Sequence, residues 1–187
     1  MSKSSEAQGT TMKGPFVMDL EKIRAQARKD MDDGPVTQSY KADRDTVLRL
    51  LNGALATELV CTLRYKRHYF MAKGINSEAV AQEFLEHANE EQQHADQLAA
   101  RIVQLGGAPD FAPDSLSARS HSEYKEGTDL TDMIRENLVA ERIAIDTYRE
   151  IVRYLGDADT TTRRIFEEIL AVEEEHADDM ADLLASR

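Results

Sequence analysis

The chain has 187 residues, of which 41% are hydrophobic, enough to bury the core of one ordinary domain. Its formal net charge of -12 disfavours nucleic acid and anionic membranes as partners and suits a protein that handles cations. The single cysteine, Cys61, excludes an internal disulfide and any site built from four thiolates. With a small, polar start and no apolar run approaching membrane length, the sequence predicts a cytoplasmic protein.

Residues 1–44 form a region of distinct composition. Up to position 45 the chain carries eight basic and eight acidic residues, so all of the excess negative charge lies further on. The stretch "VMDLEKIRAQARKD" (17–30) places apolar residues on one stripe, typical of a weak amphipathic helix, and "DDGP" (32–35) ends it. We therefore predict a docked N-terminal arm with one short helix over 1–44 and a helical domain over 45–187.

The domain begins with two long helices joined by a short turn. Apolar residues recur every three or four positions over 43–73, and Gly74 follows where a C-terminal cap belongs. Ser77 can cap a second helix that continues to Gly106.

A long crossover with two prolines follows, with room for one short helical turn. A third helix is expected from Thr128 to just before Gly156, and a fourth over 160–184. This order predicts an all-α four-helix bundle in which one long connection joins two tight helix pairs.

The two halves of the domain repeat one another. The stretch "ATELVCTLRY" (56–65) aligns with "VAERIAIDTY" (139–148), so two Glu and two Tyr match at a spacing of 83 positions. Near the end of each half, "EQQHAD" (91–96) aligns with "EEEHAD" (173–178) at a spacing of 82 positions. Each half therefore contains one mid-helix Glu and one Glu-x-x-His. The six residues are Glu58, Glu91, His94, Glu141, Glu173 and His176.

This set of residues indicates a pair of metal ions. A Glu and a His three positions apart lie on one helix face, one turn from each other. Glu58 and Glu141 sit among apolar neighbours, where an unpaired carboxylate costs several kcal/mol and needs a cation. Four carboxylates with two imidazoles suit iron, manganese or zinc. The alternative is a polar core of ordinary helical salt links, which would explain one copy of the motif but not two copies in register.

At this point the sequence resembles the ferritin-like superfamily over about residues 45–184, in particular bacterioferritins and Dps-like mini-ferritins with a di-iron centre inside each subunit. The resemblance implies that Glu91 and Glu173 bridge two Fe ions, with Glu58 and His94 on one ion and Glu141 and His176 on the other. It also implies a ferroxidase that oxidises Fe(II) with O2 or H2O2 and stores ferric iron in a hollow homo-oligomer. Manganese or zinc could occupy the same ligands.

Three departures from the family pattern shape the expectations. Bacterioferritins bind haem through a Met between the bridging Glu and its His, whereas this chain has Gln92 there, so we expect no haem. The sequence ends at Arg187 without a fifth helix, which favours a dodecamer over a 24-mer. The tail has zero net charge, which does not favour direct DNA binding.

Several other residues are open to two interpretations. Tyr65 and Tyr148 follow Glu58 and Glu141 by seven positions, so each phenol could bind a ligand carboxylate or relay an electron, or could be a plain core aromatic. His87, one heptad before His94, lines an iron path or is a buried or interface histidine. The run "YKRH" (65–68) is interpreted as mostly an exposed basic strip.

Two other functions remain open at this stage. A non-storing di-metal enzyme, such as a peroxidase or manganese catalase-like protein, would use the same ligands and assemble into a smaller particle. A metal-free helical scaffold would carry the same apolar pattern and bind no iron.

Overall fold

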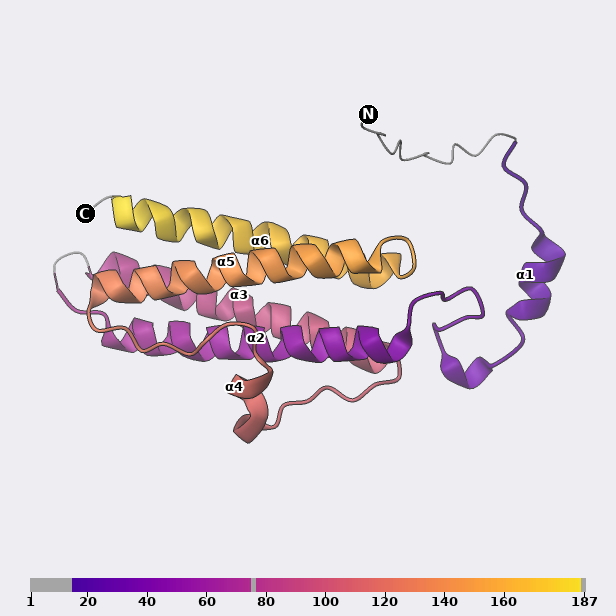
Figure 1. Ribbon diagram of the computed structural model, residues 1–187, viewed down its shortest axis with the longest axis horizontal. Coiled ribbons are helices and arrows are strands. Elements are labelled where there is room, and N and C mark those ends of the chain that lie inside the picture. Colours follow the sequence, from indigo (N-terminus) through magenta and orange to yellow (C-terminus); the bar gives the residue numbers. More distant parts are fainter. Residues whose placement is uncertain (1–14, 75–76, 186–187) are drawn as a thin grey trace, which may run out of the picture.

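The computed structural model describes residues 15–74 and 77–185, and within them every regular element is helical (Figure 1). The elements are α1 (Leu20–Gln26), η1 (Met31–Asp33), α2 (Arg44–Met71), α3 (Ser77–Gln104), η2 (Pro113–Ser115), α4 (Leu116–Arg119), α5 (Leu130–Leu155) and α6 (Thr160–Ala185). The four long helices end within a few residues of the predicted bounds. The predicted all-α bundle with a long crossover and a preceding arm is therefore confirmed.

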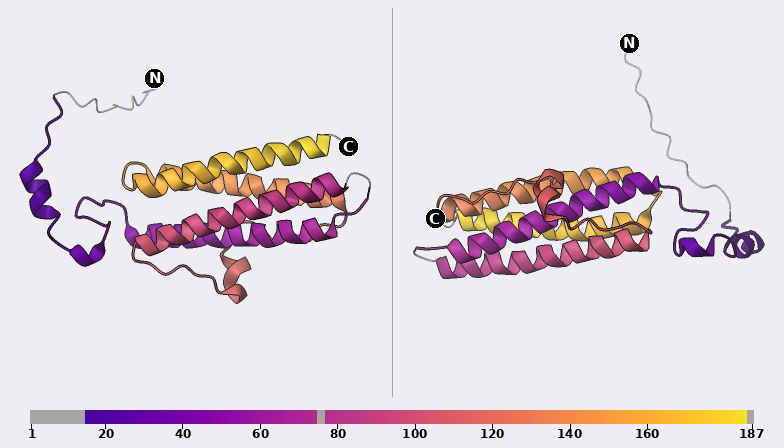
Figure 2. Two further views of the ribbon diagram at one scale, coloured as in Figure 1. Left: turned by 180° about the vertical axis from the view of Figure 1, so that it is seen from behind. Right: turned by 90° about the horizontal axis from the view of Figure 1, so that it is seen from below.

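The four long helices form two antiparallel hairpins, α2 with α3 and α5 with α6. The crossover returns along the bundle, so α5 starts at the end where α2 turns into α3 (Figure 1). Within the crossover, α4 packs Leu116 against Ala56 and Val60 of α2. Two further views show that all four helices run along one common axis (Figure 2). Side chains in the middle of each helix can therefore meet inside the bundle.

Local sequence explains where the helices of the second hairpin start and stop. The Asp129 carboxylate accepts a hydrogen bond from the backbone N of Asp132 at 2.9 Å and caps the start of α5. Gly156 ends α5 with a φ of 45°, a conformation that favours glycine. The Asp159 carboxylate then accepts from the backbone N of Thr162 at 2.9 Å and caps α6. Gly156 and Asp159 therefore determine the tight turn between α5 and α6.

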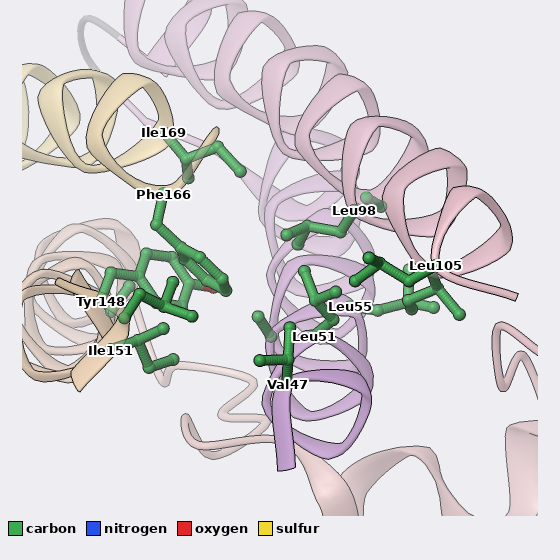
Figure 3. Packing of buried hydrophobic residues seen from close by; sticks show 14 residues of the cluster. Val47, Leu51, Leu55, Leu98, Leu105, Tyr148, Ile151, Phe166 and Ile169 are labelled. Carbon is green, nitrogen blue, oxygen red and sulfur yellow. The ribbon is translucent and has the colours of Figure 1, made fainter. Parts of the chain in front are cut away.

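The main apolar core fills the half of the bundle that is nearer the start of α2 (Figure 3). In this view Leu51 and Leu55 of α2 face Leu98 of α3, while Tyr148 of α5 lies beside Phe166 of α6. The two rings are 5.4 Å apart between centroids. A second cluster around Tyr65 and Phe84 fills the other half, so the polar centre between them is closed off from water at both ends.

The N-terminal arm differs from the expectation in one respect. Helix α1 is shorter than the predicted 17–30 and buries no residue, with Ile23 still 47% exposed. A helix of seven residues is marginal without a packing partner, which explains the early ending. The arm instead attaches through Val36 and Tyr40, which pack against the main core. The Tyr40 hydroxyl also donates to Asp159 at 2.9 Å. The division of the chain at residue 44 into arm and domain stays a prediction.

Helix α2 is long and apolar enough to cross a membrane by length and composition alone, contrary to the expectation that no apolar run approaches that length. However, 56% of its most apolar stretch is buried inside the bundle. It also carries the buried side chains Glu58 and Arg64. Core helices of water-soluble bundles pass the same test, so this stretch is explained by burial against the other three helices.

Candidate metal centre

The bundle brings the six side chains singled out by the repeat to one place in its interior. Helices α2 and α5 contribute one Glu each, and α3 and α6 contribute one Glu-x-x-His each. None of the six is more than 5% exposed. The helical spacing explains this, because a Glu and a His one turn apart on α3 point to the same spot as their counterparts on α6.

The six donors form two overlapping groups. One contains Glu58, Glu91, His94 and Glu173, and the other contains Glu91, Glu141, Glu173 and His176. In the first group, His94 Nδ1 lies 3.4 Å from Glu58 Oε2 and 3.1 Å from Glu173 Oε1. In the second group, His176 Nδ1 lies 3.5 Å from Glu91 Oε1 and 3.5 Å from Glu173 Oε2. Glu91 and Glu173 belong to both groups, so the two groups lie side by side with two shared carboxylates.

The hydrogen-bond inventory tests whether these donors fit metal ions. Among the described residues, thirteen buried side-chain N and O atoms lack a hydrogen-bond partner, and eight of them belong to these six residues. They include both oxygens of Glu91 and of Glu173, and the Nδ1 atoms of both histidines. Buried polar atoms normally find partners, and unsatisfied ones cost free energy. Atoms converging in this way fit two divalent cations bound by oxygen and nitrogen.

Without a cation, the buried carboxylates and imidazoles of the cluster have strongly shifted pKa values. Burial and the neighbouring carboxylates raise the pKa of Glu58 and of Glu141 well above the usual range. Burial pushes the pKa of Glu91 in the same direction, but the nearby Glu58 carboxyl and the two imidazoles outweigh it and lower the value. Burial disfavours a charged His176, yet the nearby Glu173 and Glu91 carboxylates raise its pKa to about 12. The cluster therefore holds protons that metal ions would have to displace.

The two tyrosines reach across the bundle to carboxylates of the opposite helix. The Tyr65 hydroxyl of α2 donates to Glu141 Oε1 of α5 at 2.5 Å. The Tyr148 hydroxyl of α5 donates to Glu58 Oε1 of α2. Both rings are fully buried, and burial beside a carboxylate raises the pKa of each phenol well above its usual range. Each tyrosine therefore holds a carboxylate of the centre in position.

His87 lies in direct contact with the centre, a role for which the sequence offered only its heptad spacing from His94. Its ring stacks on the His176 ring with 3.9 Å between centroids, and its Nδ1 lies 3.2 Å from the Tyr65 hydroxyl. The His176 ring also contacts Glu90, whose Oε2 lies 2.8 Å from His176 Nε2. Carboxylates in this position fix the ring orientation of metal-ligating histidines. The sequence did not single out Glu90, because the repeated Glu-x-x-His motif begins at its neighbour Glu91.

The interpretation of residues 65–68 as an exposed basic strip is wrong for two of its four positions. Tyr65 and His68 are fully buried, because both point from α2 toward the rest of the bundle. Arg64, just before this run, is also buried and donates to Asn137 Oδ1 of α5 at 2.8 Å. Helical periodicity alone would have placed Tyr65 and His68 on one face, three positions apart.

Comparisons with known proteins agree with this geometry. A family model described as a ferritin-like domain matches residues 48–186. A bacterioferritin from Brucella melitensis is 32% identical over 145 residues, which cover 74% of this chain and 84% of that protein. A nutrient stress-induced DNA-binding protein from Nostoc sp. is 28% identical over 138 residues, which cover 72% of this chain and 75% of that protein.

Solved structures give the same result. The bacterioferritin-related protein from Bacteroides fragilis, described as a dodecameric thioferritin, superimposes with a TM-score of 0.76 at 34% identity, covering 78% of this chain and 88% of that chain. The bacterioferritin from Rhodobacter capsulatus is described with a metal-free dinuclear site and a haem iron. It superimposes with a TM-score of 0.68 at 27% identity, covering 78% of this chain and 86% of that chain. The matched family region includes all six buried donors and both tyrosines. This chain therefore belongs to the ferritin-like family.

Proposed function

We propose that this protein is a di-iron ferroxidase that oxidises Fe(II) and stores the ferric product inside a cage of identical subunits. The observation that carries the proposal is the convergence of six buried donors from four helices, most of whose metal-facing atoms have no hydrogen-bond partner. A metal-free scaffold would have to keep these groups buried and unsatisfied, which costs free energy that no bound cation offsets.

The ligand roles follow from membership of the two donor groups. Glu91 and Glu173 are common to both, so they are the proposed bridges between two ions. Glu58 and His94 complete one ion's ligands, and Glu141 and His176 complete the other's; these roles extend the sequence prediction. Tyr65 and Tyr148 are proposed as positioning residues for the carboxylates that they touch, and as a short route for an electron.

The proposed reaction uses Fe(II) as substrate. Two Fe(II) give one electron each to O2, which takes up two protons and becomes H2O2. With H2O2 as oxidant, two electrons and two protons break the O–O bond and yield two waters. Holding both ions between shared carboxylates lets the two electrons leave as a pair. Mn(II) or Zn(II) also fits the same oxygen and nitrogen donors, but Zn(II) has no redox chemistry and cannot be oxidised.

The proposed assembly is a dodecamer in the cytoplasm. The Bacteroides fragilis relative is described as dodecameric, and it is 34% identical to this chain. Haem is not part of the proposal, because Gln92 stands where the family's haem-binding Met would be, although the Rhodobacter capsulatus bacterioferritin is described with a haem iron. Direct DNA binding is not proposed either, since the first 45 residues carry no net charge to attract phosphates.

The test adds Fe(II) to purified protein without oxygen, then supplies O2 or H2O2 and follows the ferric absorbance. The same sample is sized by light scattering and imaged for a dense core. The variant Glu91→Gln/Glu173→Gln should lose oxidation and core formation, because it removes both proposed bridges. The control Glu78→Gln/Glu168→Gln removes two exposed carboxylates from the same helices and should retain both.

The outcomes separate the proposed functions. Oxidation by a cage with a dense core supports storage. Oxidation by a dimer without a core points to the non-storing di-metal enzyme instead. If the wild-type protein takes up no iron, or the bridge variant oxidises it as fast as the control, the proposal is wrong.

A further inference from the structure

We propose that Glu83, His87 and Asp179 form a third divalent-cation site, outside the paired donor groups of the centre. The three residues lie where α3 and α6 meet, a region we call the α3–α6 seam. The site is argued from its own contacts and goes beyond iron oxidation. Fe(II) would be its natural occupant, and this part of the inference alone rests on the proposed function.

The seam contains a hollow of about 190 Å³. Five carboxylates and two imidazoles line it: Glu83, Glu86, His87, Glu90, Glu175, His176 and Asp179. Within residues 15–74 and 77–185, no Lys or Arg forms an ion pair with any of these carboxylates. Glu90 pairs with His176, and the other four carboxylates, which have no Lys or Arg partner, favour a cation from solution.

The hydrogen bonds of His87 decide which ring nitrogen carries its proton. The Tyr65 hydroxyl has one hydrogen, and the 2.5 Å contact with Glu141 uses it. The Tyr65 oxygen can therefore only accept from His87 Nδ1, which lies 3.2 Å away and must carry the imidazole proton. In the neutral imidazole this leaves His87 Nε2 with a free lone pair, on a side chain that is only 2% exposed.

That lone pair faces two carboxylates. His87 Nε2 lies 3.3 Å from Glu83 Oε1 and 3.4 Å from Asp179 Oδ2. Three acceptors pointed at one another repel unless a proton or a cation lies between them. Four ligand atoms placed tetrahedrally about 2.1 Å from a metal ion are about 3.4 Å apart, so these separations fit such an ion.

The placement of the three residues also suits a site that exchanges ions with solvent. Glu83 and His87 are one helical turn apart on α3, and Asp179 approaches from α6. Glu83 and Asp179 are 36% and 44% exposed, so a hydrated cation can reach them before it contacts the buried imidazole. One nitrogen and two carboxylate donors suit Fe(II), Mn(II) or Zn(II).

The internal repeat shows that this cluster is an addition to the shared plan. With the spacing of 82 positions, Glu83 and His87 correspond to Ile165 and Ile169, and Asp179 corresponds to Gln97. Ile169 is buried at 1% and belongs to the apolar core. A bundle with this fold therefore fills the equivalent space with hydrocarbon. The polar version on the α3–α6 seam has no packing requirement that explains it.

The competing explanation is a protonated His87 that forms ordinary ion pairs with Glu83 and Asp179. Equilibrium dialysis with Zn(II) at pH 7, with metal measured by emission spectroscopy, separates the two. Wild-type protein should bind one Zn(II) per chain more than Glu83→Gln/Asp179→Asn, which keeps His87 and its buried contacts. The control Glu86→Gln/Glu175→Gln removes the same charge from the same hollow and should match wild type. Circular dichroism checks that each variant retains its helices.

A fourth protein distinguishes failure of this site from failure of the central one. Glu91→Gln/Glu173→Gln should lose the ions of the centre and keep the one bound at the seam. If Glu83→Gln/Asp179→Asn binds as much Zn(II) as wild type, the third site does not exist, whatever the centre does. If Glu91→Gln/Glu173→Gln loses nothing while Glu83→Gln/Asp179→Asn loses one ion, the third site stands and the proposed function falls.

Discussion

Tyr65 of α2 donates its hydroxyl proton to Glu141 of α5, although a carboxylate of its own helix lies two turns earlier in the sequence. The reciprocal bond runs from Tyr148 of α5 to Glu58 of α2. Each half of the repeat therefore orients a carboxylate that belongs to the other half. The two hairpins are joined at the centre by hydrogen bonds as well as by any shared metal ions.

Removing either phenol should weaken the centre without emptying it. Tyr65→Phe and Tyr148→Phe should each lower Zn(II) affinity about 10- to 100-fold, because a partner that fixes a ligand is lost while all six donors remain. Competition titration with a chromophoric chelator measures the change. Tyr154→Phe, at a position that is 54% exposed, is the control. Equal affinities in all four proteins would show that the tyrosines only fill space.

Replacing Glu141 by Gln should stabilise the metal-free protein at neutral pH. The pKa of Glu141 is raised in the folded state by burial and by Glu91 and Glu173, so the folded chain holds a proton that the unfolded chain releases. That group contributes stability below about pH 4.5 and loses it as pH rises toward its folded pKa. Gln removes the loss, so the gain should grow from pH 4.5 to 7.

At pH 7 the expected gain for Glu141→Gln is about 1 to 4 kcal/mol, measured by urea unfolding in the presence of a chelator. Excess Zn(II) should reverse the order, because wild type then gains binding free energy that the variant lacks. A metal-free Glu141→Gln protein that is less stable than wild type at pH 7 would contradict the picture of an uncompensated buried carboxylate.

His68 should make the protein less stable as pH falls below neutrality. Burial and the nearby Arg64 lower its pKa to about 4, from an ordinary value of 6.5. Its contribution is fully present above pH 6.5 and is lost as pH falls toward 4, because the unfolded chain then binds a proton that the folded chain refuses. His68→Gln should show a shallower loss of unfolding free energy over this window. Parallel pH profiles for both proteins would remove His68 as a cause.

The arm should detach from the bundle when one hydrogen bond is removed. Tyr40→Phe loses the 2.9 Å bond to Asp159, which leaves that carboxylate with Arg101 and Thr162. We expect faster proteolysis between residues 26 and 42 and a loss of about 0.5 to 1.5 kcal/mol in unfolding free energy. Peptide mapping after brief digestion identifies the cut. Cleavage within α2 at the same rate would instead indicate that the whole bundle has loosened.

The sequence was informative about the bundle because two independent signals coincided. Apolar periodicity and capping residues such as Ser77 set the long helices, and these are local properties of the chain. The in-register repeat predicts that the buried Glu and His residues belong to one site. Their convergence in the structure needed only the usual packing of two hairpins.

What the sequence did not predict depends on contacts between distant segments. The crossed tyrosine bonds depend on how α2 and α5 face each other, which a periodic pattern does not specify. The hydrogen-bond partners of His68 belong to the crossover, whose carbonyl oxygens at Lys125 and Glu126 lie 3.1 Å from its Nε2. The short α1 reflects the lack of a packing surface within the single chain. In each case the structure depends on tertiary contacts, which local sequence does not specify.

The stacking of His87 on His176 makes the two halves of the centre unequal. Cations that entered through the α3–α6 seam would meet the imidazole of His176 first, because His87 stacks on it and His94 belongs to the other donor group. Occupancy should then be sequential, with the position of Glu141 and His176 loaded ahead of its twin. A duplicated hairpin that began with two equivalent metal positions would in this way fill them in a fixed order.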